Sequence, residues 1–376
     1  MNSCKIRLLF CAHIRWYNAE AEYVHRLARG ALERGCEVLL WGKPGSPLLE
    51  KARSDGIPIL AFGDPGSLNP AMMSAVHRAA SDLVREGRFQ VVNALRSEGF
   101  PLIAAAARSA GARVVRTRAD MRPPKLVPLN RLLHRNYADL VIAANDLIRE
   151  ELLVRLKLPP ERVRTVRFGI DPAELEPGPG DPALARELGL KPTDRVVGLM
   201  GRLGRVKGQE FALRAAEEVS ARVPEARFLV IYRDVEDSDR FLSELSRSKL
   251  RDRFVLVGPR PAHREVMRLC EVALIPSVGS EANCRVALEW MALAVPVIGS
   301  RVGVIPELIE HGTTGFLVQP RYGETLARCL IELLKNPARA RAMGEAGRQR
   351  LLSHFTQDHM VEQSLSAFQG FVQKQH

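Results

Sequence analysis

The sequence has no long apolar run. None of its uninterrupted apolar stretches approaches the roughly 18 to 20 residues that a membrane-spanning helix needs. The N-terminus offers only a short apolar stretch before His13 and Arg15, which is too short for the core of a signal peptide. We therefore expect a cytoplasmic protein.

The sequence also lacks the cysteine patterns of zinc sites. Its six cysteines, at positions 4, 11, 36, 270, 284 and 329, form no CxxC pair and have no histidine at zinc-finger spacing. In a chain of 376 residues, this scatter is typical of free thiols in a reducing compartment. We expect no structural zinc, and we disfavour Cys284 as a nucleophile.

Positive charge is concentrated in the first half of the chain. Residues 1–171 hold 27 Lys and Arg against 17 Asp and Glu, a net charge of +10, out of +12 for the whole chain. Eight of these cations fall between positions 108 and 135, where the one acid is Asp120: Arg108, Arg113, Arg116, Arg118, Arg122, Lys125, Arg131 and Arg135. The cluster favours an anionic partner, with a solvated basic surface as the alternative. Nucleic acid is the least favoured partner, since the sequence has no recognised reading module.

Short apolar runs alternate with amphipathic patterns, which is typical of parallel βαβ units. The strands are expected near residues 6–11, 38–41, 57–62, 89–92, 112–116, 140–143, 196–200, 226–231, 254–257, 272–275 and 295–298. Residues 172–192 hold five prolines and three glycines, which predicts a linker. The sequence therefore predicts an α/β protein with two doubly wound, Rossmann-like domains, residues 1–171 and 193–355, and a C-terminal helix over 356–376.

The loop from Gly201 to Gln209 is the first candidate ligand site. It follows an expected strand, and ligands of doubly wound sheets bind beyond the carboxyl ends of the strands. Its glycines allow close approach of the backbone, and Arg202 and Lys207 bring two cations to a helix N-terminus suited to anions. A diphosphate would satisfy this loop. It is not a Walker A loop, because Gly208 follows Lys207 where that motif has Ser or Thr.

The second candidate site follows the expected strand that ends at Ile275. Glu281 falls in the loop, and Glu289 falls about two turns into the next helix, within an otherwise apolar run. A charge in such a run needs a partner, which favours a ligand contact over a solvated carboxylate. The amides around residues 282–285 open the helix and suit a phosphate.

Together these residues resemble the retaining, nucleotide-sugar-dependent glycosyltransferases of family 4, whose fold has two facing Rossmann-like domains (GT-B). The similarity includes the E-x7-E pair, Glu281 and Glu289, and it continues through these segments: Gly201-Arg202-Leu203, Lys207-Gly208, Pro276-Ser277, Phe168 to Asp171, Gly299 to Glu307 and Gly312 to Val318.

The resemblance implies a donor site for a nucleoside-diphosphate sugar. Arg202 and Lys207 would neutralise the diphosphate, with Gly201 in the same loop, and Glu289 would hold the ribose. Glu281 would contact the transferred sugar, helped by amides near these residues: Asn283, Cys284 and Arg285. Glu281, Arg202 and Lys207 are then the catalytic candidates. No metal or other cofactor is expected, since the cations and the helix dipole would neutralise the charge.

The acceptor side departs from the family pattern. Family members usually carry a histidine after a strand of the N-terminal domain, but residues 91–98 and 116–120 contain none. The acceptor-side candidates are therefore Asn18, Glu98, Arg118 and Asp120. The basic first domain suggests a glycan or lipid-linked acceptor of the bacterial envelope, such as lipopolysaccharide, and peripheral docking on an anionic membrane. The alternatives are a non-catalytic nucleotide-sugar-binding protein and a sugar-nucleotide epimerase.

Overall fold

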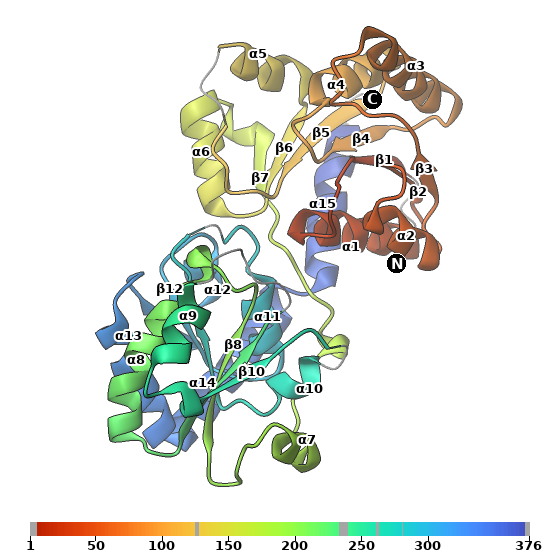
Figure 1. The fold of residues 1–376 in the computed structure, drawn as a ribbon. Helices are drawn as coiled ribbons and strands as arrows, with labels where there is room; N and C mark the ends of the chain where they lie inside the picture. The colour runs from red at the N-terminus through yellow and green to blue at the C-terminus, as the bar shows by residue number, and fades with distance from the viewer. Residues whose placement is uncertain (1–5, 125–127, 233–239, 261–262, 280, 373–376) are drawn as a thin grey trace. The chain divides into compact units, whose positions relative to one another are not determined.

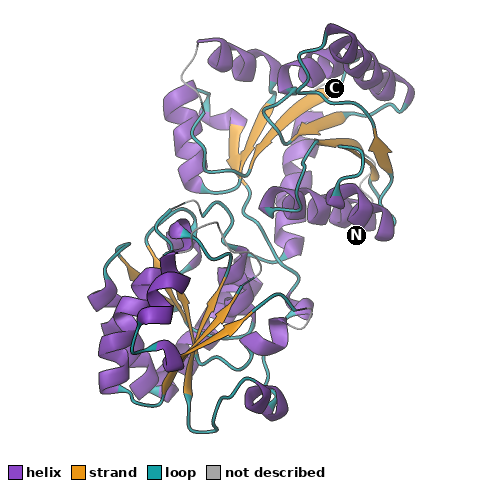
Figure 2. Cartoon of the chain, viewed as in Figure 1, coloured by secondary structure: helices purple, strands orange, loops and turns teal. Residues whose placement is uncertain are grey.

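The computed structural model describes residues 6–124, 128–232, 240–260, 263–279 and 281–372. The chain forms two compact units (Figures 1 and 2). Unit 1 comprises Met1–Gly169 and Gln357–His376, and unit 2 comprises Ile170–Thr356. The α/β fold with two Rossmann-like sheets, expected from the sequence, is confirmed.

Unit 1 is built on a seven-stranded parallel sheet with the strand order β3-β2-β1-β4-β5-β6-β7. Its strands are β1 Arg7–Ala12, β2 Glu37–Gly42, β3 Ile59–Ala61, β4 Val91–Ala94, β5 Arg113–Arg118, β6 Leu140–Ala143 and β7 Val163–Thr165. Its helices are α1 Ala19–Glu33, α2 Pro47–Ser54, α3 Pro70–Glu86, α4 Phe100–Ser109, α5 Pro128–Tyr137, α6 Asp146–Leu156, η1 Pro160–Arg162 and α15 Gln357–Val372. The C-terminal helix α15 packs against α1, and α3 packs against α4 (Figure 1).

Unit 2 is built on a six-stranded parallel sheet with the strand order β10-β9-β8-β11-β12-β13. Its strands are β8 Arg195–Met200, β9 Ala226–Ile231, β10 Phe254–Val257, β11 Val272–Ile275, β12 Val297–Ser300 and β13 Gly315–Val318. Its helices are η2 Pro172–Glu174, α7 Pro182–Glu187, η3 Arg205–Lys207, α8 Gln209–Arg222, α9 Arg240–Arg247, η4 Arg251–Arg253, α10 His263–Met267, α11 Arg285–Ala292, α12 Ile305–Leu308, α13 Gly323–Lys335 and α14 Pro337–His354. Helix α8 packs against α13, and α11 packs against α14.

The central strands are apolar because helices cover both faces of each sheet. Every residue of β11 and of β12 is buried, as expected for a parallel sheet whose side chains all enter a core. In unit 2 the core includes a stacked aromatic pair, Phe228 and Phe254, with ring centroids 4.8 Å apart.

The order of the strands reverses direction beside β8 in unit 2, because β9 lies on one side of it and β11 on the other. The same reversal occurs beside β1 in unit 1, between β2 and β4. Connections leave the sheet in opposite directions at such points, so the loops at the carboxyl ends of the strands open a crevice there. The loops after β8 and β11 are therefore the first place to look for a site in unit 2.

The segment expected to link the domains, residues 172–192, belongs to unit 2. It contains η2 and α7, and three of its leucines are buried: Leu175, Leu184 and Leu190. Two of its five prolines, Pro172 and Pro182, begin short helices, where a missing N–H is tolerated, so this density of proline does not prevent packing.

The sequence did not predict several elements that the structure contains. Strand β7 is only three residues long, and α14 is polar along most of its length, so neither has a strong apolar period. Among the described cysteines, Cys11, Cys270, Cys284 and Cys329 are free thiols. Cys36 is disulfide-bonded, so the expectation of free thiols throughout is wrong for this residue.

Candidate active site

The loop between β8 and α8 turns sharply at Gly208. This residue has φ +68, in the left-handed region that favours glycine, and a Cβ there would lie 2.1 Å from the carbonyl oxygen of Pro276. The backbone of Val278 also donates a 2.8 Å hydrogen bond to the carbonyl of Val206. The loops after β8 and β11, which are far apart in the sequence, are thus held against each other.

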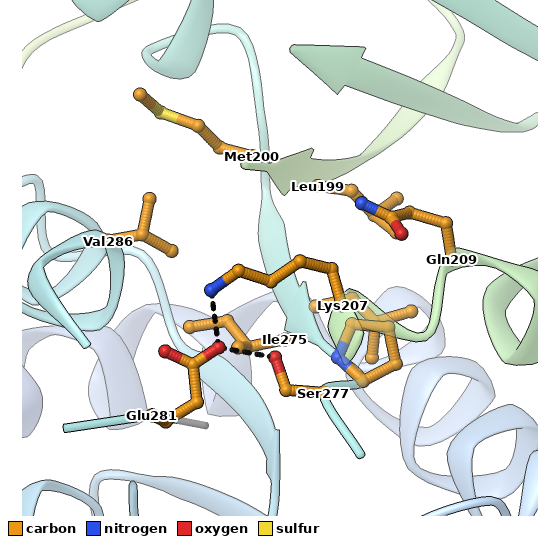
Figure 3. A pocket seen from close by; sticks show the side chains of 10 residues that line it. Leu199, Met200, Lys207, Gln209, Ile275, Ser277, Glu281 and Val286 are labelled. Atoms are coloured by element: carbon orange, nitrogen blue, oxygen red, sulfur yellow. Dashed lines mark hydrogen bonds and ion pairs between the residues drawn. The ribbon is translucent and has the colours of Figure 1, made fainter. Parts of the chain in front are cut away.

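Lys207 and Glu281 meet where these two loops touch (Figure 3). The Nζ of Lys207 lies 2.6 Å from Oε1 of Glu281, and the hydroxyl of Ser277 donates a 2.6 Å hydrogen bond to the same oxygen. Glu281 and Ser277 are 4% and 1% exposed. The three side chains line a pocket whose other lining residues are Leu199, Met200, Gln209, Leu274, Ile275, Pro276 and Val286. The site therefore presents a buried carboxylate and a cation side by side.

A third loop fixes the main chain of Glu281. Its carbonyl accepts a 2.8 Å hydrogen bond from the amide of Val304, just before α12. Gly303 has φ +52, and a Cβ there would lie 2.0 Å from the same carbonyl oxygen. Glu281 is thus held by loops from β8, β11 and β12, so its position is set by the sheet.

The ion pair controls the charge of Lys207. Burial disfavours the ammonium form, but the carboxylate of Glu281 outweighs burial and raises the pKa of Lys207 above its ordinary value. Lys207 therefore keeps its positive charge at neutral pH. Burial, reinforced by the Glu281 carboxylate, raises the pKa of the Cys284 thiol well above its ordinary value. Cys284 is therefore a protonated thiol and a poor nucleophile, which agrees with its low rank as a catalytic candidate.

Arg202, expected beside Lys207, is not among the residues that line this pocket. Its side chain is exposed, and its carbonyl accepts a 2.9 Å hydrogen bond from Nε2 of Gln209. Gln209, the last residue of the candidate loop, lines the pocket, although no role was expected for it from the sequence. A polar residue directly after the left-handed Gly208 is the signal that could have identified it.

The start of α11 is suited to an anion. Cys284 stands at the N-cap with φ +39, a left-handed conformation that is uncommon for residues other than glycine, and its side chain does not cap the helix. No acidic residue lies in the first turn of the helix, although the Glu281 carboxylate lies close enough to raise the pKa of the Cys284 thiol. Asn283 is buried beside Cys284, and Arg285 begins the helix itself.

Glu289 is buried in α11, at 3% exposure, and it forms an ion pair with Arg285 across one helical turn at 3.1 Å. From the sequence, a charge in this apolar run was expected to need a ligand. The structure supplies a protein partner for it, so the charge of Glu289 alone does not require a ligand.

The acceptor-side candidates belong to unit 1. Asn18 caps α1, and its Oδ1 accepts hydrogen bonds from the amides of Glu20 and Ala21 at 3.1 and 3.0 Å. Glu98 is paired with Arg96 at 3.0 Å. Asn18 therefore stabilises the start of α1. Glu98 is exposed and forms an ion pair with Arg96.

Arg118, the last residue of β5, and Asp120, just beyond the strand, lie together. A guanidinium nitrogen of Arg118 lies 3.3 Å from Asp120 Oδ1 and donates a 2.6 Å hydrogen bond to the carbonyl of Arg122. Arg116, on the same face of β5, is 1% exposed and donates to the carbonyls of Ala94 and Thr117. The sequence showed that this strand is basic, but it did not show that two of its arginines are buried.

In the described residues, no group of three or more His, Cys, Asp or Glu side chains is placed to hold a metal ion. None of the helices formed by the described residues has the length and apolar character needed to cross a membrane.

Two family models match the chain and follow its two units. Residues 21–174 match "Glycosyltransferase Family 4", and residues 181–350 match "Glycosyl transferases group 1".

The curated relatives are of several kinds. The α-maltose-1-phosphate synthase of Mycolicibacterium smegmatis is 34% identical over 249 residues, which cover 61% of this chain and 63% of that protein. The D-inositol 3-phosphate glycosyltransferase of Segniliparus rotundus is 30% identical over 259 residues, which cover 66% of this chain and 56% of that protein. The matches thus span less than two thirds of these relatives.

Solved structures share the fold along the whole chain. HepE of Anabaena, solved in complex with UDP, has a TM-score of 0.83 at 19% identity and covers 97% of this chain and 100% of its own. A glycosyltransferase of Rickettsia africae has a TM-score of 0.88 at 16% identity and covers 99% of this chain and 100% of its own. With both units matched in sequence and the whole chain matched in fold, this protein belongs to the family 4 glycosyltransferases of GT-B fold.

Proposed function

We propose that this protein is a retaining glycosyltransferase that moves a hexose-type sugar from a nucleoside-diphosphate sugar to a glycan or lipid-linked acceptor. The observation that carries the proposal is the ion pair between half-buried Lys207 and buried Glu281 at the carboxyl ends of β8 and β11. The cation suits the diphosphate of a nucleotide sugar, and the neighbouring carboxylate suits the hydroxyls of the sugar that is joined to it. The structure of HepE with UDP-glucose, which shares this fold, supports such a donor.

The donor-side roles follow from the chemistry of each group. Lys207 neutralises the diphosphate, and the exposed guanidinium of Arg202 reaches it from the same loop. The amides that open α11 assist, since charge builds on the diphosphate as its bond to the anomeric carbon breaks. Glu281 accepts hydrogen bonds from hydroxyls of the transferred sugar, and Glu289 from those of the ribose. The reaction is proposed to need no metal, because these groups together neutralise the leaving group.

For the acceptor, we propose an anionic molecule of bacterial envelope polysaccharide or lipopolysaccharide synthesis. The excess of positive charge in residues 1–171 supports this class. The names of three relatives also include anionic compounds, which are maltose 1-phosphate, inositol 3-phosphate and, for a Bacillus anthracis relative, malate. Arg118 and Asp120 are the described acceptor-side residues that lie together.

For a lipid-linked acceptor, unit 1 would dock on an anionic membrane from the cytoplasmic side. Helix α5 supports this: Leu132 is 54% exposed, and Arg135 on the same helix is exposed as well. Docking through such a surface depends on charge, so we expect binding to anionic liposomes at low salt that weakens as salt is added. A protein that ignores anionic liposomes at low salt would contradict the membrane part of the proposal.

The donor site is tested by ligand-induced stabilisation. We expect one of UDP, GDP and ADP, or its sugar conjugate, to raise the melting temperature, since a ligand at 100 times its Kd adds about 2.7 kcal/mol. The variants Lys207→Ala and Glu289→Ala should lose the shift, whereas Lys191→Ala, at an exposed position, should keep it. No shift with any nucleotide in folded protein would contradict the proposed function.

A second candidate function follows from the lack of histidine in residues 91–98 and 116–120, where family 4 enzymes usually carry one on the acceptor side. A binding protein without catalysis, or a sugar-nucleotide epimerase, could share the donor site. Incubating the protein with a nucleotide sugar in the absence of an acceptor distinguishes the three functions. An epimerase changes or releases the sugar, and a binding protein leaves it intact. A transferase consumes the nucleotide sugar when the acceptor is added.

A further inference from the structure

Ser277 is buried, with an exposed fraction of only 1%, so its hydroxyl does not face solvent. It lies two residues beyond the end of β11, where the backbone is held by the hydrogen bond from Val278 to Val206. Its hydroxyl donates to Oε1 of Glu281 at 2.6 Å (Figure 3). This hydroxyl is therefore a fixed donor aimed at a buried carboxylate.

The hydrogen bonds from Lys207 and Ser277 to the Glu281 carboxylate fall on the same oxygen. Both Lys207 Nζ and Ser277 Oγ bind Oε1, each at 2.6 Å, so Oε2 receives neither of them. In Figure 3 the second oxygen is turned away from Ser277. Oε2 is then the oxygen of Glu281 that neither Lys207 nor Ser277 occupies, and a ligand hydroxyl can donate to it.

The two donors differ in how firmly they hold the carboxylate. Lys207 has a long, flexible side chain that is 31% exposed, so it can follow Glu281 or turn to an anionic ligand. Ser277 has a short side chain on a fixed backbone, so it determines where Oε1 lies. A reactive or binding group needs such a support to keep its geometry within about half an ångström.

We propose that Ser277 is a positioning residue that fixes Glu281 so that Oε2 faces the hydroxyls of the transferred sugar. The proposal rests on the proposed function, because it assumes a nucleotide sugar in this pocket. It assigns Ser277 to recognition of the sugar and leaves binding of the nucleoside diphosphate to Lys207, Arg202 and α11. A purely structural serine would instead affect stability and leave the preference for the sugar conjugate unchanged.

The test compares the Kd of UDP with that of UDP-glucose, and likewise for GDP and ADP with their glucose conjugates, by calorimetry. In the wild type we expect the conjugate of the accepted nucleotide to bind more tightly than the bare nucleotide. In Ser277→Ala this preference should fall by roughly 5-fold, the size of the net contribution of one ordinary hydrogen bond, while the Kd of the bare nucleotide changes less than 2-fold. Ser277→Thr, which keeps the hydroxyl, should restore part of the preference.

Two controls separate positioning from general damage. Ser220→Ala removes a hydroxyl from α8 that makes no hydrogen bond within the described structure, and it should leave both affinities unchanged. In a Glu281→Ala background, Ser277→Ala should have no further effect on the preference, because Ser277 acts through Glu281. If Ser277→Ala does not fold, Ser277→Cys, a similar size with a weak donor, takes its place.

The outcomes are distinct. Binding of no nucleotide at all by the wild type would overturn the proposed function itself. If the wild type binds a nucleotide without preferring its sugar conjugate, or if Ser277→Ala keeps the full preference, the donor site stands and the role of Ser277 is wrong. An effect of Ser277→Ala that persists unchanged without Glu281 would also overturn it.

Discussion

Lys207 and Glu281 form an ion pair with an N–O distance of 2.6 Å, although 74 residues separate them in the chain. Strands β8 and β11 are neighbours in the sheet, so the loops that follow them meet. The pair is the part of the candidate site that the tertiary structure places most firmly.

Removing the cation should destabilise unit 2. In Lys207→Ala, the carboxylate of Glu281 stays buried and loses one of its two donors, which we expect to cost about 2 kcal/mol in the free energy of unfolding. Chemical denaturation of the wild type, Lys207→Ala and the exposed control Lys191→Ala measures this. The double variant Lys207→Ala/Glu281→Ala should lose less than the sum of the single losses. Equal stability of Lys207→Ala and Lys191→Ala would contradict the prediction.

Gly208→Ala should be more harmful than an ordinary substitution of glycine. The residue has φ +68, and its new Cβ would lie 2.1 Å from the carbonyl oxygen of Pro276. Gly189 is a matched control, because its φ is +73 and a Cβ there meets nothing within 4 Å. We expect Gly189→Ala to cost about 1 kcal/mol for the left-handed conformation alone. Gly208→Ala should exceed that loss in the free energy of unfolding and should weaken nucleotide binding; similar losses for both would show that the loops move apart easily.

His134 should make unit 1 sensitive to acid. Burial, followed by the nearby charges of Arg116 and Arg118, lowers the pKa of His134 to about 4, against the opposing hydrogen bond to the carbonyl of Asn130. The unfolded chain binds a proton near pH 6.5 and the folded chain does not, so stability is lost as the pH falls from about 6.5 to about 4.

The loss from His134 amounts to about 3 kcal/mol at most. Denaturation of the wild type and of His134→Gln at pH 7 and pH 4.5 measures it, and the wild type should lose more stability than the variant. His354, which is exposed, serves as control in His354→Gln. Identical pH dependence of the wild type and His134→Gln would show that His134 is not held neutral.

Cys284 should resist alkylation. Burial and the Glu281 carboxylate raise the pKa of its thiol, so little thiolate is present at pH 8. Mass spectrometry after treatment with iodoacetamide should find Cys284 modified far more slowly in folded than in unfolded protein. Half-buried Cys329 provides the comparison in the same sample. Rapid modification of Cys284 in folded protein would contradict the buried geometry at the start of α11.

The sequence predicted the alternation of strands and helices well, because buried parallel strands are short apolar runs that need no long-range information. Strands β6, β9, β10 and β11 begin and end as expected. It failed where the local signal is weak: β7 is only three residues long, and α14 has little apolar periodicity. The expected linker packs onto unit 2 because its leucines are buried, which its prolines and glycines did not reveal.

For the candidate site, the sequence identified Lys207, Glu281 and the glycine between strand and helix, because phosphate-binding loops have local signatures. It did not reveal that Gln209 lines the pocket, that Arg285 pairs with Glu289, or that Arg202 lies outside the lining. These are questions of where side chains point. A rotation of the backbone redirects a side chain without any change in the sequence pattern.

By itself, the sequence therefore determined the class of fold, the positions of the loops that follow the strands and the residue types that they carry. Only the tertiary structure decided which of those residues meet. The hydroxyl of Ser277 and the ammonium of Lys207 share one oxygen of Glu281 because β11 pairs with β8 through a crossover, which places two distant loops at the same edge of the sheet. Such contacts depend on the pairing of strands over long separations, and no local pattern of residues encodes that pairing.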